Sequence, residues 1–526
     1  MNGAQALIRT LYNCGIEVCF TNPGTSEMHF VDALDDVPQV KGVLALFEGV
    51  VTGAADGYGR IAGKPAATLL HLGSGLGNGV ANLHNAKRAF TPIVNIVGDH
   101  ATYHTQYDPP LASDIASIAR AVSGWTRSAT NTVNLGNDVR DAVNASYGPP
   151  GTVASLILPA DTSWNDGAEP LGGWSRPSPN FIEADAIDQA AKALASSRSN
   201  ALLLGSNALT KANLVLAKRI SALTGAKLLC ETFPAKLERG GSIPGVERLG
   251  YLAEFMELQL SGVDNLIVIG AKAPVSFFAY PGKQSYLVPE TCSLIEVVPP
   301  GLPTQQSLEA LLDSINSSRS PENGLLGNPS KGPELPSPTQ ISGDLNAELF
   351  AQVIGATLPE GAIISDESNT SGLFVASATV NCPEHTVLTL TGGAIGQGLP
   401  VGVGAAMAAP DRPVLCLESD GSSMYTIQSL WTQAREGLNV TNIILNNGSY
   451  AVLNMELNRV GAQEPGPAAK RMLDISDPDI NFVALGQSMG IPSVRVDRAE
   501  ALVKEIGKAF SEPGPHLIET MVPSII

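Results

Sequence analysis

The sequence predicts an α/β protein built from three doubly wound parallel sheets. Short apolar runs alternate with longer helical segments along the whole chain, which is the pattern of strand–helix–strand units. With 526 residues the chain is too long for one core, because single cores stop growing at roughly 250–300 residues. Two segments rich in small and polar residues, about 165–180 and about 317–343, separate three blocks. We therefore expect three domains, at 1–165, 181–316 and 344–526.

The elements expected within each block follow one rhythm. Each strand-like run holds three to six mostly apolar residues, and a helical segment separates it from the next run. Strands joined in this way pair in parallel, so helices should cover both faces of each sheet. The expected strands are 18–20, 43–47, 66–70 and 93–97 in the first block, 201–204, 227–230, 266–269 and 294–298 in the second, and 362–365, 414–418, 440–445 and 516–521 in the third.

Composition excludes several classes of protein. The net charge of −18 argues against binding to nucleic acid or to an anionic membrane surface. No run of 18 apolar residues is present, so we expect no membrane span. The six cysteines are scattered without a CxxC pair, and the N-terminus lacks the features of a signal peptide. These features indicate reduced thiols and a cytoplasmic location.

Three side chains of the first block lie where a strand gives way to a helix. Thr25 lies in the loop 21–27, where a threonine can cap the helix that follows. Glu48 opens a helix crowded with small residues, which permit close packing against a neighbouring element. His71 ends the strand 66–70 beside a glycine-rich loop, a position suited to a general acid or base. Each side chain is also compatible with a structural role, as a cap or as a charge at a helix end.

The most informative pair in the third block is Asp420 and Asn447, which are 27 positions apart. The intervening sequence predicts a helix over 424–436 and a buried strand over 440–445, so both side chains can end at one edge of a sheet. A carboxylate and an amide oxygen suit Mg²⁺ that also holds phosphates. The turn Gly421–Ser422 offers backbone N–H groups to a diphosphate at a helix start. Taken singly, each motif is typical of an ordinary turn, so the indication lies in their combination.

In their order along the chain, these motifs resemble those of thiamine-diphosphate-dependent 2-oxo-acid decarboxylases and acetolactate synthases. The likeness covers essentially the whole chain, and its nearest branch is that of acetolactate synthase large-subunit homologues. One departure is Ser419, where the metal-binding signature of the family normally has glycine. The motifs that carry the resemblance are Asn22-Pro23-Gly24, Glu48 with Ala55-Asp56-Gly57-Tyr58, Gly393–Gly396 with Leu399-Pro400, Asp420-Gly421-Ser422 and Asn447.

The resemblance implies a role for each domain and for individual residues. The first domain would bind the pyrimidine of thiamine diphosphate and the third its diphosphate, with a central domain between them. Glu48 would hydrogen-bond the aminopyrimidine, Gly393 would accept a hydrogen bond from it, and Ile395 would bend the cofactor. The implied magnesium ligands are Asp420, Asn447 and the backbone carbonyl of Ser449. The implied diphosphate-binding residues are Asn369, Thr370, Gly421 and Ser422.

The detailed site residues resemble those of benzoylformate decarboxylases more than those of acetolactate synthases. His71 falls at the position of a catalytic histidine in benzoylformate decarboxylases, and Thr25 falls where they have a catalytic serine. Acetolactate synthases typically lack this histidine. The second catalytic histidine of the decarboxylases has no counterpart, because Pro274–Tyr280 is apolar and aromatic. The run Gly245–Tyr251 does not match the flavin-contacting segment of acetolactate synthases, so we do not expect FAD.

The predicted activity is decarboxylation of a small 2-oxo acid, such as pyruvate, with carboligation, as in acetolactate synthases. Thiamine diphosphate and Mg²⁺ are the expected cofactors. Two alternatives remain: a simple decarboxylase that releases an aldehyde, and a catalytically silent regulatory homologue that binds the cofactor. The resemblance also implies active sites between subunits, in a homodimer or homotetramer.

Overall fold

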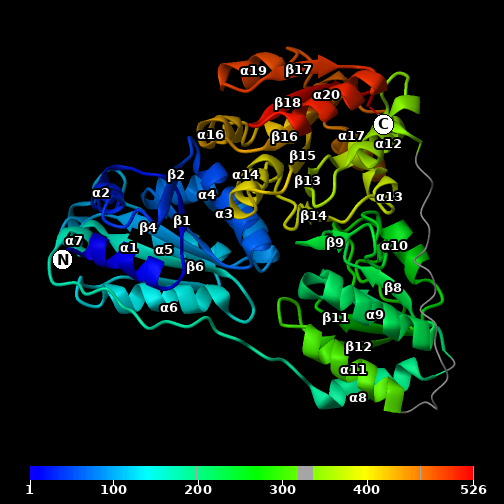
Figure 1. Ribbon diagram of the computed structural model, residues 1–526, viewed down its shortest axis with the longest axis horizontal. Coiled ribbons are helices and arrows are strands. Elements are labelled where there is room, and N and C mark those ends of the chain that lie inside the picture. The colour runs from blue at the N-terminus through cyan, green and yellow to red at the C-terminus, as the bar shows by residue number, and fades with distance from the viewer. Residues whose placement is uncertain (197, 318–335, 463, 525–526) are drawn as a thin grey trace.

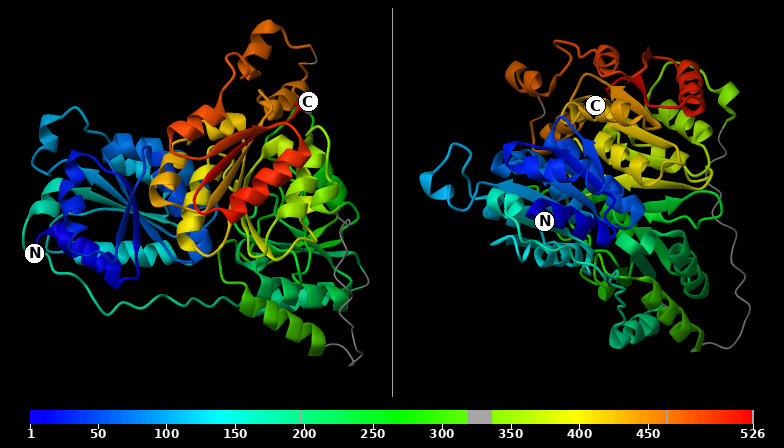
Figure 2. Two further views of the ribbon diagram at one scale, coloured as in Figure 1. Left: turned by 45° about the horizontal axis from the view of Figure 1, so that its top comes forward. Right: turned by 60° about the vertical axis from the view of Figure 1, so that its left-hand side comes forward.

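The computed structural model describes residues 1–196, 198–317, 336–462 and 464–524, and it contains three α/β units in chain order (Figure 1). Each unit has a sheet of mainly parallel strands with helices packed against it. The predicted fold class is therefore confirmed. The expected joint at 317–343 falls largely on residues outside the described ranges. The expected joint at 165–180 has no helix and crosses as an extended trace to the central unit (Figure 2).

The first unit contains a six-stranded sheet in the order β2-β1-β3-β4-β6-β5, and every neighbouring pair is parallel. Its strands are β1 (Val18–Asn22), β2 (Lys41–Leu44), β3 (Ala66–Leu70), β4 (Ile93–Asp99), β5 (Trp125–Ser128) and β6 (Val153–Pro159). Its helices are α1 (Gly3–Asn13), α2 (Met28–Ala33), α3 (Glu48–Ala62), α4 (Leu72–Arg88), α5 (Ile115–Val122), α6 (Leu135–Tyr147) and α7 (Ala160–Trp164).

The central unit contains a five-stranded parallel sheet in the order β10-β8-β7-β11-β12. Its strands are β7 (Asn200–Leu204), β8 (Lys227–Cys230), β10 (Glu247–Arg248), β11 (Asn265–Ile269) and β12 (Ser293–Val298). Its helices are α8 (Ala184–Leu194), α9 (Lys211–Thr224), α10 (Ala253–Leu260) and α11 (Gln305–Ser317).

The third unit contains a seven-stranded sheet in the order β17-β18-β16-β15-β13-β14-β9. Its strands are β13 (Ile363–Glu367), β14 (His385–Thr389), β15 (Val414–Ser419), β16 (Val440–Asn446), β17 (Ser493–Val496), β18 (His516–Met521) and β9 (Leu237–Arg239). Its helices are α12 (Ala347–Thr357), α13 (Val375–Ala378), α14 (Gly398–Ala408), α15 (Asp420–Ser423), α16 (Ser429–Glu436), α17 (Ala451–Arg459), α18 (Pro467–Leu473), α19 (Phe482–Ser488) and α20 (Ala499–Ser511). Strand β9 comes from the central part of the chain and pairs antiparallel with β14.

The first and third units share one strand order once β9 is set aside. Strands β13, β14, β15, β16, β17 and β18 occupy the places that β1, β2, β3, β4, β5 and β6 occupy in the first unit. Helix α14 thus corresponds to α3, and the two helices pack against each other. A Cβ on Gly57 would lie 2.1 Å from the Val401 carbonyl oxygen, and a Cβ on Gly404 would lie 1.9 Å from that of Ala54. Small residues therefore bring two backbones of one chain into direct contact.

The helix expected over 424–436 begins later than predicted, as α16 at Ser429. Tyr425 N–H donates to the Ser422 carbonyl and Thr426 N–H to that of Ser423, so tight turns fill the first residues. The Thr426 hydroxyl donates to the Gly396 carbonyl at 2.9 Å, which ties this stretch to the glycine-rich loop. The residues before α16 therefore form turns and a contact with a residue 30 positions earlier in the chain, in place of the predicted first helical turn.

Two expectations from composition concern the described residues directly. No helix in the described ranges is both long and apolar enough to cross a membrane. All six cysteines lie in those ranges, and none of them is paired in a disulfide.

Candidate active site

The carboxyl ends of three adjacent strands, β13, β15 and β16, meet at one edge of the third sheet. Asp420 follows β15 and Asn447 follows β16, and the structure brings them into contact. Asp420 Oδ2 accepts hydrogen bonds from the backbone N–H groups of Asn447 at 2.9 Å and Gly448 at 2.7 Å. Its Oδ1 accepts one from the Gly421 N–H at 2.8 Å. The Asp420 carboxylate thus organises the loop that carries Asn447.

Asp420 is buried, and only 2% of its surface is exposed. Burial raises the pKa of Asp420 above its usual value, although backbone hydrogen bonds from Gly421 and the 447–449 loop act in the opposite direction. A buried carboxylate has lost favourable interactions with water, and a bound cation stabilises its charged form. A cation bound beside Asp420 would offset part of the cost of burying its charge.

The oxygen atoms around Asp420 are of the chemical type that magnesium prefers. Asn447 Oδ1 accepts from the Ser449 N–H at 2.9 Å, and Asn447 Nδ2 donates to Ser371 Oγ at 3.2 Å. One carboxylate, one amide oxygen and the nearby Ser449 carbonyl form a set of hard oxygen ligands. Across the described ranges, no group of three His, Cys, Asp or Glu side chains could hold a metal. A site that completes its shell with phosphate oxygens needs only one carboxylate.

The loop after β13 lies beside the Asp420 turn. Asn369 has a φ of +48° and donates from Nδ2 to the Glu367 carbonyl at 3.1 Å and to Ser419 Oγ at 2.9 Å. Thr370 follows it in the same single turn of 3₁₀ helix. The Ser422 hydroxyl, predicted to hold diphosphate, instead donates to Glu418 Oε1 at 2.6 Å in this structure.

The glycine-rich loop 392–398 is held from several directions. The buried Glu367 carboxylate accepts from the N–H groups of Gly396, Gln397 and Gly398 at 2.6 to 2.8 Å. Burial raises the pKa of Glu367 to about 7, against these hydrogen bonds. Gly393 has a φ of +75°, a conformation that other residues rarely adopt.

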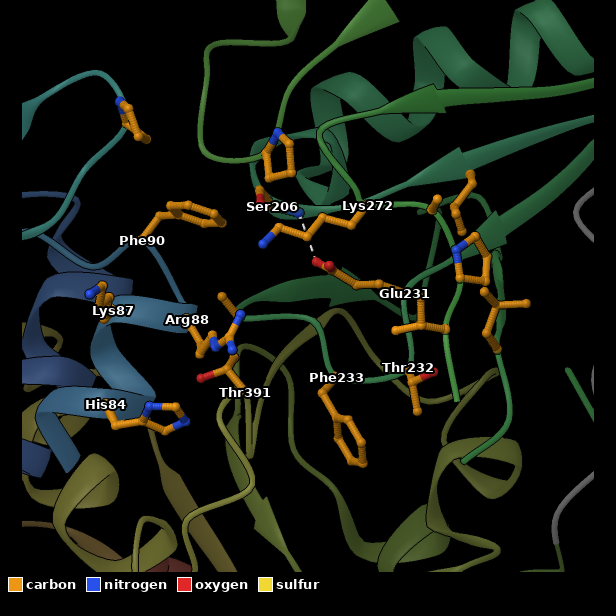
Figure 3. Close-up of a pocket in the computed structure, with 18 of the residues that line it drawn as sticks. His84, Lys87, Arg88, Phe90, Ser206, Glu231, Thr232, Phe233, Lys272 and Thr391 are labelled. Atoms are coloured by element: carbon orange, nitrogen blue, oxygen red, sulfur yellow. Dashed lines mark hydrogen bonds between the residues drawn. The ribbon is translucent and has the colours of Figure 1, made fainter. Parts of the chain in front are cut away.

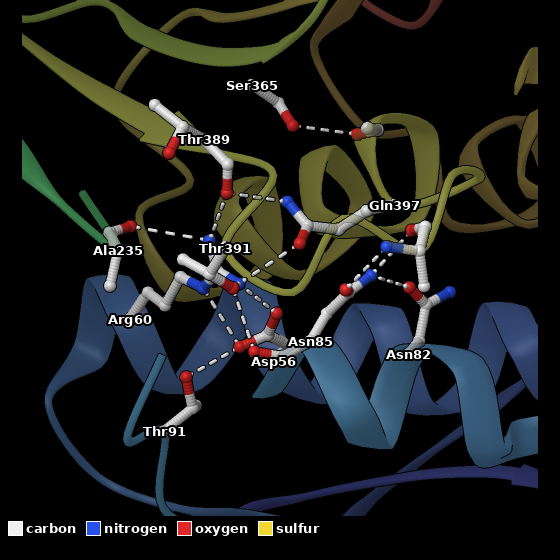
Figure 4. A network of polar contacts seen from close by, with 12 residues as sticks. Asp56, Arg60, Asn82, Asn85, Thr91, Ala235, Ser365, Thr389, Thr391 and Gln397 are labelled. Carbon is white, nitrogen blue, oxygen red and sulfur yellow. Dashed lines mark hydrogen bonds and ion pairs between the residues drawn. The ribbon is translucent and has the colours of Figure 1, made fainter. Parts of the chain in front are cut away.

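Helix α4 supplies further contacts to the glycine-rich loop (Figure 4). Asn85 Nδ2 donates to the Ala394 carbonyl at 2.8 Å, and His84 Nε2 lies 3.1 Å from the Gly392 carbonyl oxygen. Ile395 follows Ala394 in the loop and is half-buried. The loop backbone therefore has a fixed shape before any ligand is considered.

Glu48 is the first residue of α3 and is almost fully buried. Its Oε2 accepts a hydrogen bond from Asn78 Nδ2 at 3.0 Å. Asn82 Nδ2 donates both to the Gly49 carbonyl at 2.9 Å and to the Gly396 carbonyl at 3.2 Å. The start of α3 and the glycine-rich loop are thus joined through one side chain within a single chain.

His71 contacts a residue whose role the sequence did not reveal. Its Nδ1 lies 2.8 Å from Glu27 Oε2, which also accepts from the Gly24 N–H at 2.8 Å. Burial raises the pKa of Glu27, and the charge interaction with His71 lowers it. A Cβ on Gly24 would lie 2.2 Å from His71 Nδ1, so only glycine fits beside the ring. Thr25 is exposed in the same turn.

Glu27 was not singled out by the sequence because it reads as an ordinary charge in a first helical turn. In the structure it is only 1% exposed, and its second oxygen, Oε1, is buried without a hydrogen-bond partner among the described residues. The sequence feature that could have indicated this contact is a glutamate that follows one strand and a histidine, 44 residues later, that follows another. That separation becomes a contact only because β1 and β3 are neighbours in the sheet.

An aromatic cluster stands near the glycine-rich loop. The ring centroid of Phe277 lies 5.8 Å from the ring centroid of Phe233, 5.3 Å from that of Tyr251 and 5.0 Å from that of Phe278. A Cβ on Gly393 would lie 2.7 Å from Phe277 Cζ, so this ring covers the loop. Within the Pro274–Tyr280 segment, the side chain beside the loop is thus the apolar ring of Phe277.

Arg60 of α3 forms a buried ion pair with Asp56 of the same helix and also hydrogen-bonds residues of the third unit (Figure 4). Arg60 Nε donates to Asp56 Oδ1 at 2.9 Å, and its Nη1 donates to the Thr389 carbonyl at 2.8 Å. Its Nη2 donates to Thr391 Oγ1 at 3.0 Å and to Gln397 Oε1 at 3.2 Å. One arginine of α3 therefore holds both ends of the strand-to-helix connection that contains the glycine-rich loop.

A cavity of about 770 Å³ opens between the first and central units (Figure 3). It lies at the carboxyl ends of the central strands, where open α/β sheets commonly bind ligands. Glu231 Oε1 accepts from the Ser206 N–H at 2.9 Å, and Lys272 extends beside this carboxylate. Burial raises the pKa of Glu231 to about 7. The absence of a flavin cofactor remains a prediction from the sequence.

Two models of one protein family match this chain. The family model described as "Thiamine pyrophosphate enzyme, N-terminal TPP binding domain" matches residues 1–119. The model described as "Thiamine pyrophosphate enzyme, C-terminal TPP binding domain" matches residues 370–520. The predicted resemblance to this group of enzymes is therefore confirmed.

Two curated relatives match along nearly their full length. The chain is 53% identical over 530 residues to the "Putative acetolactate synthase large subunit IlvX" of Mycobacterium tuberculosis, covering 100% of both chains. It is 28% identical to the benzoylformate decarboxylase of Pseudomonas aeruginosa, covering 97% of each. Among solved structures, a thiamine diphosphate-dependent 4-hydroxybenzoylformate decarboxylase of Rhodococcus jostii RHA1 shares the fold, with a TM-score of 0.84, 24% identity and 99% coverage of both chains.

Proposed function

The chain belongs to the family of thiamine-pyrophosphate-dependent enzymes, and from this premise we propose that it decarboxylates a small 2-oxo acid and transfers the acyl group to a second carbonyl compound. The proposed cofactors are thiamine diphosphate and Mg²⁺. We propose that residues 1–165 bind the pyrimidine end of thiamine diphosphate and 344–526 the diphosphate end, with 181–316 as the central domain.

The observation that carries this proposal is the contact between the Asp420 carboxylate and the loop of Asn447, with Oδ2 2.9 Å from the Asn447 nitrogen. Mg²⁺ would take one Asp420 oxygen, Asn447 Oδ1 and the Ser449 carbonyl, and would leave positions for two phosphate groups. On a chain of net charge −18, a cation beside Asp420 would be needed to hold a diphosphate. The residues proposed to contact the diphosphate are Asn369, Thr370, Gly421 and Ser422.

The pyrimidine end of the cofactor would lie between Glu48 and the glycine-rich loop. Gly393 would accept a hydrogen bond through its carbonyl, and the side chain of Ile395 would hold the two rings in a bent arrangement. Glu48 would hydrogen-bond the pyrimidine ring and exchange a proton with it. When bound, thiamine diphosphate supplies the electron sink for cleavage beside a carbonyl, and the protein supplies binding, orientation and exclusion of water.

His71 would transfer protons to and from the substrate. Glu27 holds Nδ1 of the ring, so Nε2 is the nitrogen that can exchange a proton with a bound 2-oxo acid. Thr25 would contact the substrate from the exposed turn beside this pair. Glu27 acts through His71, so we assign it a positioning role.

Two observations bear on the fate of the acyl group. The first observation is the 53% identity over the full length to a protein named "Putative acetolactate synthase large subunit IlvX", which favours carboligation. The second observation is the His71–Glu27 contact, which favours the alternative of a simple decarboxylase that releases an aldehyde. The apolar Phe277 beside the glycine-rich loop removes one proton donor expected of that alternative. We place carboligation first.

We further propose that the protein acts in the cytoplasm as a homodimer or homotetramer, with each cofactor between two subunits. No flavin is expected in the central domain. The proposed substrates are pyruvate or a related 2-oxo acid, without nucleic acid or membrane partners.

Release of CO₂ and analysis of products test the function. The purified protein, with thiamine diphosphate and Mg²⁺, is incubated with pyruvate or with benzoylformate, each with and without an aldehyde acceptor. The proposal predicts CO₂ from pyruvate and acetolactate or a mixed carboligation product. Free aldehyde as the only product would favour the alternative, and no CO₂ from any 2-oxo acid tried would contradict both. Asp420→Ala serves as the inactive control.

A further inference from the structure

A second cavity, of about 420 Å³, lies between the central and third units on the far side of β9 from the cofactor residues. Its walls come from α9, from the segment 226–228, from residues 237–247 and from the connection at 380–381. Strand β9 is the edge strand of the third sheet, beyond β13 and β14 (Figure 1). No residue proposed above to bind cofactor or substrate lines this cavity. Cavities of roughly 300–1,000 Å³ commonly hold small molecules.

The lining carries more positive than negative charge, in contrast to the chain as a whole. Lys218, Lys227 and Arg239 line the cavity, and Glu247 is the carboxylate among the lining residues. Glu247 is already paired with Lys227 at 3.1 Å. Within the described ranges, neither Lys218 nor Arg239 has a carboxylate within 4.0 Å. Two cations therefore face the cavity without an anion of the protein.

The surroundings of Arg239 destabilise its positive charge. Burial lowers the pKa of Arg239 to about 10, and the nearby Arg248 acts in the same direction. Its Nη2 donates to the Ala376 carbonyl at 2.6 Å, which uses one of the five N–H groups of the guanidinium. Arg239 is partly buried and has Asp366 as a more distant source of negative charge, so an anion bound in the cavity would add a close partner for its guanidinium.

The backbone closes tightly around this arginine. Gly240 and Gly241 have φ values of +85° and +53°, so the chain turns back directly after β9. A Cβ on Gly240 would lie 2.4 Å from the Pro383 carbonyl oxygen, so the turn is pressed against the third unit. Arg239 pairs in register with His385 of β14, which fixes the position of its backbone. The guanidinium is thus attached to a well-defined part of the fold.

The rest of the lining indicates an organic ligand rather than a free inorganic ion. Leu228, Leu237, Ile243, Val246 and Val380 contribute apolar surface to the same cavity. An inorganic anion would leave these side chains in contact with water or empty space. A ligand with an anionic head and an apolar body would satisfy both parts of the lining.

We infer that this cavity binds a small organic anion, with a phosphate or carboxylate head between Arg239 and Lys218 and an apolar body against Leu237 and Ile243. The inference is independent of the proposed reaction. Because β9 pairs with β14, which leads into the glycine-rich loop, the ligand would also hold the central unit against the third unit.

Calorimetry on the full chain, saturated with thiamine diphosphate and Mg²⁺, tests the inference. The probes are phenyl phosphate and phenylacetate, which combine an anionic head with an apolar body. Inorganic phosphate represents the anionic head without the body, and benzyl alcohol represents the apolar body without the anionic head. We expect saturable binding of phenyl phosphate, phenylacetate or both, at one site per chain and with a Kd of roughly 1 mM or below. The two aromatic anions distinguish a phosphate from a carboxylate ligand. Inorganic phosphate and benzyl alcohol should each bind at least tenfold more weakly.

Variants connect binding with the cavity. Arg239→Gln and Lys218→Gln should each weaken binding of the aromatic anion at least tenfold, whereas Lys504→Gln, at an exposed lysine remote from the lining, should leave it unchanged. Circular dichroism verifies that each variant is folded, and Lys218→Gln keeps the test valid if Arg239→Gln is unstable. The bound anion should also raise the unfolding temperature of the wild type but not of Lys218→Gln. No saturable binding of either aromatic anion, or equal binding by wild type and Lys218→Gln, would overturn the inference.

Discussion

Glu27 determines which nitrogen of His71 is left for the proton transfer proposed above. Its Oε2 lies 2.8 Å from Nδ1, and its burial leaves the carboxylate with little access to water. A carboxylate in this position favours a proton on Nδ1 and leaves Nε2 for proton exchange. In the proposed reaction, Glu27 would therefore act as a positioning residue for the His71 ring.

Substitution of this pair should separate positioning from proton transfer. We expect His71→Ala to lower kcat by about 10²–10⁴-fold, as is typical for loss of a general acid or base. Glu27→Gln should lower kcat less and alter the dependence of kcat on pH, because the amide can still hydrogen-bond the ring but carries no charge. Steady-state kinetics between pH 6 and 9 provides the comparison, and cofactor affinity should stay unchanged in both variants. A wild-type pH profile for Glu27→Gln would assign Glu27 a purely structural role.

Asp420 supplies the charged ligand of the proposed metal site. Asp420→Ala should abolish binding of thiamine diphosphate, because the diphosphate would meet an acidic protein without a bound cation. Calorimetry with Mg²⁺ and thiamine diphosphate measures this loss, and removal of Mg²⁺ by EDTA should give the same result in the wild type. The control is Asp411→Ala, at an exposed aspartate. Wild-type affinity in Asp420→Ala would remove the basis of the metal assignment.

At the scale of elements, strand β8 of the central sheet is followed by Glu231, a partly buried carboxyl group that accepts a hydrogen bond from the Ser206 N–H after β7. Burial raises the pKa of Glu231 to about 7 from an ordinary 4.5. The folded state therefore binds this proton more tightly than the unfolded state does. The stability contributed in this way is fully present below about pH 4.5 and is lost as pH rises through 7, by at most ~3 kcal/mol.

Glu231→Gln should remove this dependence. The amide oxygen can still accept from the Ser206 N–H, and no charge has to be buried at high pH. We expect the variant to be more stable than the wild type at pH 8 and nearly equal to it at pH 5. Chemical unfolding at the two pH values measures the difference. If the difference in stability between the wild type and Glu231→Gln were the same at pH 5 and pH 8, burial would not be the cause of the pKa shift.

The elements also show why some of the fold follows from sequence and some does not. The long apolar strands β3, β15 and β16 are evident from their composition. Strand β9 is only three residues long, Leu237–Arg239, and exists because β14 offers an edge to pair with. Asp420 and Asn447 could be placed together because a helix and a parallel strand connect them. Glu27 could not be placed with His71, because their contact depends on sheet order rather than on local pattern.

At the scale of the whole molecule, the small residues of α3 contact α14 of the same chain. The sequence predicts that these small residues allow close packing against a neighbouring element, and in the structure that element is α14. The proposal that cofactor sites lie between subunits thus rests on resemblance to the family. It requires a test that separates chains.

Mixed subunits provide that test. Glu48→Gln and Asp420→Ala chains should each be inactive alone. After exchange, each mixed dimer should contain one site with both residues intact. We expect recovery of activity up to about one site per mixed dimer. Recovery is compared with unmixed variants at equal total protein, and subunit exchange is verified by native mass spectrometry. No recovery despite verified exchange would indicate that each site is built from one chain.

The central claim is that Glu48 activates thiamine diphosphate held by Asp420 and Asn447. Hydrogen–deuterium exchange at C2 of the bound cofactor, followed by rapid quenching and NMR, tests it most directly. Wild type and His71→Ala should exchange at similar rates, because His71 serves the substrate. Glu48→Gln should still bind the cofactor but exchange more slowly by about 10²–10⁴-fold. Exchange at the wild-type rate in Glu48→Gln, with cofactor bound, would contradict the account.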